Sequence, residues 1–465
     1  MEEKRIFEEN IEEIIELAKN KQFKDIREVL LSYNYADIGE ILEEVLEEVG
    51  INETIIIFRL LPKDTSVEVF SYLPTDDQVR IINGITDIEI KYIIEELDFD
   101  DKIDILEELP ANLVDKILEK TPKNERSLIN TFLNYPEDCA GTLMTPDYIS
   151  LQENWTVRQA LDYIKKEGMD SETIYTCYVK SAGRKLEGIV SLRTLVVSDD
   201  NLMIEDIMHR DIVDINVYED QEEVSEKFKK YGFIAIPVVD NEKRLVGIIT
   251  VDDIFDVIEE EATEDIERMA GVLDDSDTEY LDMSVWQHVK NRFPWLFFLM
   301  LSYILTGSII STSEETLSAV PALIVYMPML MGTGGNSGSQ SATLIIRGLS
   351  VGEIDMRDTL RVLWKEIRVS VLIGVSLSVL NFARVMFEQR DNPLQLQVAL
   401  VVSIAMIAIV IAAKSIGSML PILAKKIGID PALMASPMIS SLTDMVSIGT
   451  YLLLAGAFLG VIWFL

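Results

Sequence analysis

The last 29 residues of the chain, Pro437–Leu465, contain a single charged side chain, that of Asp444. Beyond it, 21 consecutive residues are uncharged and mostly apolar, enough for a helix to cross a hydrocarbon layer of about 30 Å. A carboxylate there costs about 3 kcal/mol unless water, a cation or a partner compensates it. It either reaches the headgroup region from a helix end or belongs to an ion pathway. We favour the ion pathway, because Asp444 lies about two turns beyond Pro437.

The charge of the chain is distributed unevenly. Residues 1–290 contain 69 Asp and Glu against 30 Lys and Arg, a net charge of −39, whereas the remaining residues contain 10 against 11. A very acidic soluble part therefore precedes a nearly neutral membrane part. Such a negative field repels nucleic acid and concentrates cations, so we expect no nucleic-acid partner.

Residues 1–140 are predicted to form an acidic, all-α domain, because apolar residues recur at helical spacing among many Glu and Lys. Leu-Pro pairs at Leu61, Leu73 and Leu109 fall on a period of 12. Proline ends one helix and allows the next to start. Short helices at a fixed period predict a superhelical solenoid, with an irregular bundle as the alternative.

Residues 141–258 contain two similar units about 60 residues apart. Each predicts a helix, at 157–166 and 222–231, followed by two strands. The second strands lead into Gly188–Ser191 and Gly247–Thr250, which share a Gly-x-x-[Ser/Thr] ending. Each unit resembles a CBS motif, and the resemblance implies an α/β tandem CBS module.

Residues 252–269 predict a helix of unusual charge, with nine acidic residues and no base before Arg268. Like charges at i,i+4 destabilise a helix by a few tenths of a kcal/mol each, about 0.2–0.5. We interpret the stretch as a divalent-cation site, although a solvated face is equally plausible for Glu259 and Glu260. Residues 259–285 would then form an acidic connecting, plug-like helix.

Residues 286–465 are predicted to form an α-helical transmembrane domain of five spans. The first is residues 294–313, the second 316–346, the third 369–383, and the fourth starts at 393. The fifth contains Asp444. Basic residues gather between the second and third spans and between the fourth and fifth. We therefore expect a multi-pass protein of the cell (inner) membrane. The positive-inside rule places its N-terminal domains in the cytoplasm and its C-terminus outside.

The second predicted span is interrupted by the Gly- and Ser-rich run Gly332–Gln340. A phosphate-binding loop is excluded, because no Gly-Lys-[Ser/Thr] follows and the context is apolar. Small residues allow close helix approach, and Asn336 and Gln340 can offer carbonyls to a polar path. Pore lining and tight packing alone both stay open.

The residue types favour ion binding over catalysis. His209 and His288 are isolated and no His/Cys metal cluster occurs in the sequence, so we expect no enzyme. Carboxylate oxygens suit Mg²⁺, Ca²⁺ and Mn²⁺ over Zn²⁺ or Cu. One Asp444 per chain suits a hydrated Mg²⁺ if a second copy faces it across a two-fold axis.

Three segments identify a family. PMLMGTGGNSGSQSATLIIR at 328–347 and DPALMASPMISSLTD at 430–444 resemble the membrane segments of the MgtE magnesium channels, and EDCAGTLM at 137–144 resembles their linker. The resemblance implies a homodimer in a lipid membrane that conducts Mg²⁺ and is closed when cytosolic Mg²⁺ binds its acidic domains.

The resemblance also implies the roles of individual residues. Asp444 matches the pore aspartate, and Asp430 matches a residue that shares Mg²⁺ with the connecting helix. The remaining metal-site positions that it implies lie on that helix, the CBS pair and the solenoid: Glu261, Glu264, Asp265, Asp253, Asp256, Asp100, Asp104, Asp220, Glu222 and Glu68.

Two positions depart from the family pattern. Lys414 is an unexpected charge in the fourth span, and we expect it to face a neighbouring helix or, preferably, to snorkel. Thr194 replaces the aspartate of a nucleotide-binding Ser-x-x-Asp, whereas Thr250 and Asp253 keep that pattern. ATP binding, with Arg193 as a further candidate, therefore stays open.

The sequence as a whole predicts a Mg²⁺-selective channel or transporter closed by cytosolic Mg²⁺. One alternative is a transporter for another divalent cation, such as Mn²⁺ or Co²⁺, on the same scaffold. The other is a nucleotide-responsive CBS signalling protein with a membrane anchor. A mere anchor needs neither Asp444 nor the Gly-rich run.

Overall fold

The computed structural model describes residues 2–169, 171–181, 183–273, 280–281, 283–434 and 436–459. The chain forms two compact units, Met1–Glu259 and Glu260–Leu465. Helix α15 (Val251–Ala270) contributes residues to both. The predicted connecting helix, residues 259–285, was wrong in extent: it is helical only up to Ala270, and the described residues 271–273, 280–281 and 283–284 are not helical, while 274–279 and 282 lie outside the described residues.

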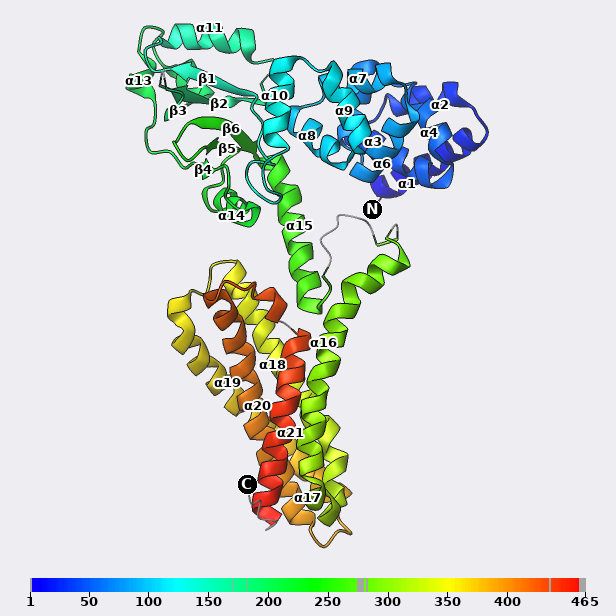
Figure 1. Ribbon diagram of the computed structural model, residues 1–465, viewed down its shortest axis with the longest axis vertical. Coiled ribbons are helices and arrows are strands. Elements are labelled where there is room, and N and C mark those ends of the chain that lie inside the picture. The colour runs from blue at the N-terminus through cyan, green and yellow to red at the C-terminus, as the bar shows by residue number, and fades with distance from the viewer. Residues whose placement is uncertain are drawn as a thin grey trace. The chain divides into compact units, whose positions relative to one another are not determined.

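The first unit begins with a purely helical region (Figure 1). Its helices are α1 (Glu2–Lys19), α2 (Phe23–Leu30), α3 (Tyr35–Glu48), α4 (Ile51–Phe58), α5 (Lys63–Ser71), α6 (Thr75–Gly84), α7 (Asp87–Glu96), α8 (Phe99–Glu108), α9 (Ala111–Lys120) and α10 (Lys123–Phe132). Helices α5 to α10 begin at intervals of 12 residues, as the Leu-Pro pairs predict.

Local chemistry explains this spacing. Pro62, Pro74, Pro110 and Pro122 precede the first residues of α5, α6, α9 and α10 in an extended conformation, which ends the preceding turn. Thr86 instead forms a capping box with Glu89. Alternate helices pack together, α3 on α5, α4 on α6, α5 on α7 and α6 on α8. The superhelical form of the stack stays a prediction.

Two three-stranded sheets follow (Figure 1). The first contains β1 (Tyr148–Gln152), β2 (Thr173–Lys180) and β3 (Leu186–Ser191), with helices α11 (Val157–Glu167), α12 (Leu192–Val197) and α13 (Ile204–Ile207). The second contains β4 (Ile215–Asn216), β5 (Ala235–Val239) and β6 (Leu245–Thr250), with helix α14 (Gln221–Tyr231). In each sheet the first pair is parallel and the second antiparallel. The two predicted repeats are therefore confirmed as two copies of one arrangement.

The helical region and the second sheet share one hydrophobic core. Ile103 and Phe132 belong to the same buried cluster as Val224 and Ile249. The linker is held as well, since the backbone N–H of Ala140 donates to the Glu219 carbonyl at 2.8 Å. Burial of this apolar surface holds α8 and the start of α15 at fixed positions within the first unit.

The second unit is built from long helices: α16 (Val285–Thr312), α18 (Met327–Ser350), α19 (Thr359–Glu388), α20 (Gln395–Lys426) and α21 (Ser436–Leu459). Short elements join them: α17 (Glu314–Ala319), η1 (Pro321–Tyr326), η2 (Met356–Asp358) and η3 (Ala432–Met434). Helices α19 and α20 pack together, and α18 packs against α20 and α21.

One sequence prediction was wrong in detail. The Gly332–Gln340 run does not interrupt its span, because α18 is helical throughout. The break lies earlier, between α17 and η1, where Val320 leaves the helical conformation and Pro321 follows. Close neighbours hold the glycines of α18 in a helix although glycine alone disfavours it.

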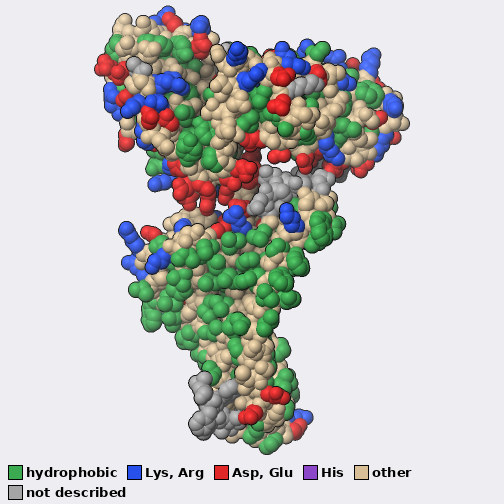
Figure 2. All heavy atoms as spheres, in the orientation of Figure 1, with side chains coloured by type: hydrophobic (Ala, Val, Ile, Leu, Met, Phe, Trp, Pro, Cys, Tyr) green, Lys and Arg blue, Asp and Glu red, His purple; other side chains and the backbone are tan. Residues whose placement is uncertain are grey.

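Four described segments are long and apolar enough to cross a membrane: Val285–Thr312, Met356–Glu388, Gln395–Lys426 and Ala432–Phe458. Hydrophobic side chains cover much of the visible surface of the second unit (Figure 2). Phe293, Leu296 and Ile304 of α16 are each at least 60% exposed, as expected for a lipid-facing surface. Helix α18 matches the second predicted span by position, but its composition is more polar, with Asn336, Gln340 and Arg347 along its length.

Candidate ion-binding sites and pathway

Asp444 lies in the third turn of α21, in an incompletely buried position. The Tyr303 side chain of α16 forms a hydrogen bond with Asp444. The preceding residue, Thr443, is buried and lies 3.0 Å from the position that a Cβ at Gly338 would occupy. Asp444 is therefore at the level of the Gly-rich turns of α18.

Helix α18 has one polar, exposed face. Gly332, Asn336, Gln340, Thr343 and Arg347 are all exposed in the single chain. At about 100° per residue these positions fall within an arc of about 80°. Side chains of this kind are costly against lipid, so the face requires water, an ion path or a second protein surface.

The opposite side of α18 is packed without space for side chains. A Cβ at Gly334 would lie 2.3 Å from the Ser447 hydroxyl, and a Cβ at Gly417 would lie 2.1 Å from the Gly338 carbonyl oxygen. The Gly-rich run thus serves close packing on one side while Asn336 and Gln340 stay exposed on the other. The two interpretations left open by the sequence apply to different faces of one helix.

A cluster of carboxylates joins the helical region to the CBS pair within the first unit. Burial, followed by Asp253 and Glu172, raises the pKa of Asp100 well above its usual range. Burial and then Asp98 and Asp253 raise the pKa of Asp101 to about 7. The predicted pair Asp100 and Asp253 is therefore brought together across α8 and α15.

Other members of this cluster behave alike. Burial raises the pKa of Asp253 to about 6, opposed by a hydrogen bond that the Thr250 hydroxyl donates at 2.7 Å. Burial and then Asp98 and Asp252 raise the pKa of Glu172 to about 7. The neighbouring charges that raise these pKa values are all carboxylates, so a divalent cation suits the cluster.

The remaining predicted residues of the first unit are less closely gathered. Asp256 is largely exposed, and its pKa is raised by the partial burial of its carboxylate and then by Glu259 and Asp252. Asp104 and Glu68 are exposed, although Glu68 is one of the charges that raise the pKa of Asp101. Asp220 caps α14 by accepting from the Glu222 N–H at 3.0 Å.

Within the second unit, the end of α15 meets the loop before α21 through an arginine. Arg268 Nη1 lies 2.9 Å from Asp430 Oδ2, and the same guanidinium pairs with Glu264. Asp430 Oδ1 also accepts from the Ala432 N–H at 2.7 Å. Burial and then Asp430 raise the pKa of Asp265, opposed by Arg347. Three of the predicted groups, Glu264, Asp265 and Asp430, therefore converge here, and Glu261 lies about one turn earlier on α15.

The preferred prediction for Lys414 was wrong. Its side chain is only 6% exposed and does not snorkel. Its Nζ donates to Ser341 Oγ at 3.1 Å and lies 3.8 Å from Glu366 Oε2. The alternative, that it faces a neighbouring helix, is what the structure shows, because a buried carboxylate compensates the buried amine.

In both CBS units, the first and last side chains of the nucleotide-binding motif contact each other at the start of a helix. Ser191 and Thr194 hydroxyls lie 2.8 Å apart at the start of α12, and Thr250 pairs with Asp253 at the start of α15. Arg193 is exposed. The carboxylate that could bind a ribose is thus present in the second unit and replaced by a hydroxyl in the first.

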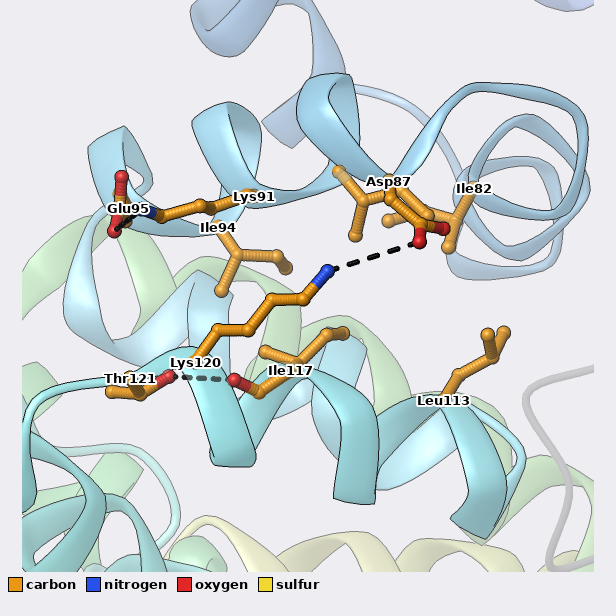
Figure 3. A pocket seen from close by; sticks show the side chains of 10 residues that line it. Ile82, Asp87, Lys91, Ile94, Glu95, Leu113, Ile117, Lys120 and Thr121 are labelled. Carbon is orange, nitrogen blue, oxygen red and sulfur yellow. Dashed lines mark hydrogen bonds and ion pairs between the residues drawn. The ribbon is translucent and has the colours of Figure 1, made fainter.

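Within the described residues, no group of three His, Cys, Asp or Glu side chains is gathered tightly enough to hold a metal ion. A pocket of about 450 Å³ lies between α7 and α9, away from the carboxylate cluster (Figure 3). Its wall is largely apolar, and Lys120 points across it to Asp87 at 3.8 Å. Because Lys120 already pairs with Asp87 and the rest of the wall is largely apolar, we assign the pocket no part in cation binding.

Comparisons with known proteins identify the family. Residues 327–454 match the model of the divalent cation transporter family MgtE, residues 33–138 match the MgtE intracellular N domain, and residues 140–199 and 204–260 match the CBS domain. The chain is also 37% identical over 434 residues to the magnesium transporter MgtE of Thermus thermophilus, covering 92% of this chain and 94% of that one. The chain belongs to the MgtE family.

A second MgtE relative, from Bacillus subtilis, is 31% identical over 97% of this chain and 98% of its own. A solved structure titled as the cytosolic domain of the Mg²⁺ channel MgtE in complex with ATP is 34% identical, with a TM-score of 0.45, and covers 50% of this chain and 99% of that one. Because MgtE is a family of transporters and this chain has several membrane-length helices, it is a multi-pass membrane protein.

Four residues that take part in the charged contacts described above were not expected from the sequence. Asp101 and Glu172 join the carboxylate cluster, and Arg268 and Glu366 compensate buried or paired charges. Only Asp101 carried a signal, since it follows Asp100 on α8. Glu172 and Glu366 are brought to their partners by tertiary packing, which no local spacing indicates.

Proposed function

We propose that this protein carries Mg²⁺ across the membrane and that cytosolic Mg²⁺ closes it. The observation that carries the proposal is the position of Asp444 beside the turns of α18 whose exposed face presents Asn336 and Gln340. A carboxylate with nearby amide carbonyls suits a cation that keeps part of its water shell. The named magnesium transporters among the relatives support the choice of ion.

A homodimer would complete this path. The polar face of α18 is exposed in the single chain, and a second copy related by a two-fold axis would enclose it and bring two Asp444 carboxylates to one ion. Hydrated Mg²⁺ then needs only one or two carboxylates, and carbonyl oxygens can contact its water shell.

Closure would follow from the acidic clusters. Besides burial, which is the largest cause, the charge of Asp253 raises the pKa values of Asp100, Asp101 and Glu172, so without a cation the repulsion among these carboxylates opposes their close approach. Mg²⁺ bound between them would reverse that repulsion and favour the compact state. The set Asp265 and Asp430 would act in the same way within the membrane unit.

The proposal places the N-terminal domains in the cytoplasm and the C-terminus outside, following the basic residues between the spans. Its first alternative is transport of another divalent cation, such as Mn²⁺ or Co²⁺, through the same path. ATP binding to the CBS module, through Arg193, Thr250 and Asp253, would add a second regulator.

The test is Mg²⁺ uptake into proteoliposomes. Asp444→Ala should lose uptake, because it removes the only carboxylate of the proposed path, and Asp444→Asn should retain little Mg²⁺ selectivity. Glu353→Gln, which removes an exposed charge between α18 and α19, is the matched control and should leave uptake unchanged. Wild-type uptake by Asp444→Ala, in protein that elutes like the wild type, would overturn the assignment.

A further inference from the structure

Three side chains from three helices form a buried charged unit in the membrane part. Ser341 of α18 donates its hydroxyl to Glu366 Oε2 of α19 at 2.6 Å and accepts from Lys414 Nζ of α20 at 3.1 Å. The Lys414 amine lies 3.8 Å from the same carboxylate oxygen. Ser341 is fully buried, and the Lys414 and Glu366 side chains are 6% and 13% exposed.

This unit fixes the rotation of α18 about its axis. Ser341 must face α19 and α20 to keep both hydrogen bonds. At about 100° per residue, Gln340 and Asn336 then point about 100° and 140° away from it, to the exposed polar face. A change at Ser341 or its partners would therefore turn the face that presents the amide carbonyls.

The unit also lies level with the Gly-rich turns. The carbonyl oxygen of Ala413 lies 3.2 Å from the Cβ position of Gly338, and Gly417 meets the Gly338 carbonyl. Lys414 lies between these two contacts on α20. An uncompensated cation at this depth would repel a divalent ion in a medium of low dielectric constant, and Glu366 cancels that charge.

We propose that Glu366, through Ser341 and Lys414, is a positioning residue that holds the polar face of α18 in place and removes the charge of Lys414 from the cation path. The inference rests on the proposed function, which requires that face to line the path. It assigns a role to a carboxylate that neither binds the ion nor faces it.

Two readouts test the proposal, both on the full chain in liposomes. The first is the rate at which Gln340→Cys reacts with a cationic and with a neutral thiol reagent, in a background where the buried Cys139 and Cys177 are alanines. This readout does not depend on Mg²⁺ transport. The second is Mg²⁺ uptake.

In Glu366→Gln, the uncompensated positive charge of Lys414 should slow the cationic reagent about tenfold relative to the neutral one. It should lower Mg²⁺ uptake by a similar factor, a coupling typical of contacting charges. The double variant Glu366→Gln/Lys414→Gln should restore both to within about threefold of wild type. The conservative Glu366→Asp, which keeps the charge, should behave like wild type toward the cationic reagent.

Equal reagent rates in wild type and Glu366→Gln, or a double variant no better than Glu366→Gln, would overturn the inference. If Glu366→Gln does not fold, Ser341→Ala replaces it: the loss of both hydrogen bonds should change the rate of the neutral reagent at Gln340→Cys, and an unchanged rate overturns the inference. Absence of Mg²⁺ uptake in the wild type, with charge-dependent labelling intact, would instead contradict the proposed function.

Discussion

Replacing Asp253 by Asn should stabilise the compact state of the first unit when no divalent cation is present. Asn keeps the size of the side chain and can still accept the hydrogen bond that the Thr250 hydroxyl donates to Asp253 at 2.7 Å. It removes the negative charge that raises the pKa of Asp100 across the contact between α8 and α15. The repulsion between the helical region and the CBS pair therefore falls.

The pKa of Asp253 sets the size of the effect. A rise from 3.8 to about 6 corresponds to about 3 kcal/mol of disfavour for the charged form. Burial is the largest cause of this rise, and Asp252 and Asp256, on the same helix, contribute a smaller part of it in every state of the unit. The part lost when α8 moves away is then about 1–2 kcal/mol, so the variant should lower the open population about tenfold.

The sign of the pH dependence follows from the raised pKa. The carboxylate destabilises the compact state fully above pH about 6. The penalty falls as pH drops from about 6 through 3.8, and it is gone well below 3.8, where the group is protonated in both states. The difference between wild type and Asp253→Asn should therefore be largest at pH 8 and small at pH 4.

Cleavage after Glu137, in the linker between α10 and β1, provides the assay. A glutamate-specific protease acts on the full chain in detergent with EDTA, and its rate follows the open population when opening is fast relative to cleavage. Glu259→Gln, an exposed acid on the same helix, is the control and should cleave nearly like wild type. Equal rates for Asp253→Asn and wild type at pH 8, or a gap that grows on acidification, would refute the reasoning.

Two further predictions concern the second unit. Arg268→Gln should leave Glu264 and Asp430 to repel each other, so amide hydrogen exchange at the end of α15 should be faster than in wild type without Mg²⁺ and slow again when Mg²⁺ is added. An exchange rate that changes neither with the substitution nor with Mg²⁺ would contradict this. Gly417→Ala places a Cβ against the Gly338 carbonyl oxygen at 2.1 Å, and should cost about 1–3 kcal/mol of stability and lower the melting temperature. Gly307→Ala, where nothing lies within 4 Å, is its control, and equal melting temperatures for the two variants would show that the helices can separate freely.

The sequence allowed much of the fold to be predicted because its signals are local. The Leu-Pro period gives the starts of helices α5 to α10, and the CBS repeats give both sheets. The acidic helix was expected at 252–269 and runs from Val251 to Ala270. In each case the spacing of neighbouring residues determines the element, so no knowledge of distant contacts was needed.

Features that depend on distant contacts were not predictable. Lys414 has no local signal for its partner, because Ser341 and Glu366 are 73 and 48 positions away in the chain and meet it only through helix packing. The Gly-rich run suggested an interruption, since glycine disfavours helices, whereas contacts with Ser447 and Gly417 keep α18 regular. Glu172 likewise reaches the carboxylate cluster through the fold of the first unit.

The most direct test of the central claim is Mg²⁺ influx into proteoliposomes as a function of Mg²⁺ on the side of the N-terminal domains. Wild-type influx should fall as that concentration rises through the millimolar range. A variant with Asp253, Asp256, Glu261 and Asp265 all neutralised should keep its influx, because several bridged ions together would supply the roughly 5.5 kcal/mol that moves a population from 1:99 to 99:1. Equal closure of both proteins by Mg²⁺ would contradict the claim that these carboxylates sense the ion.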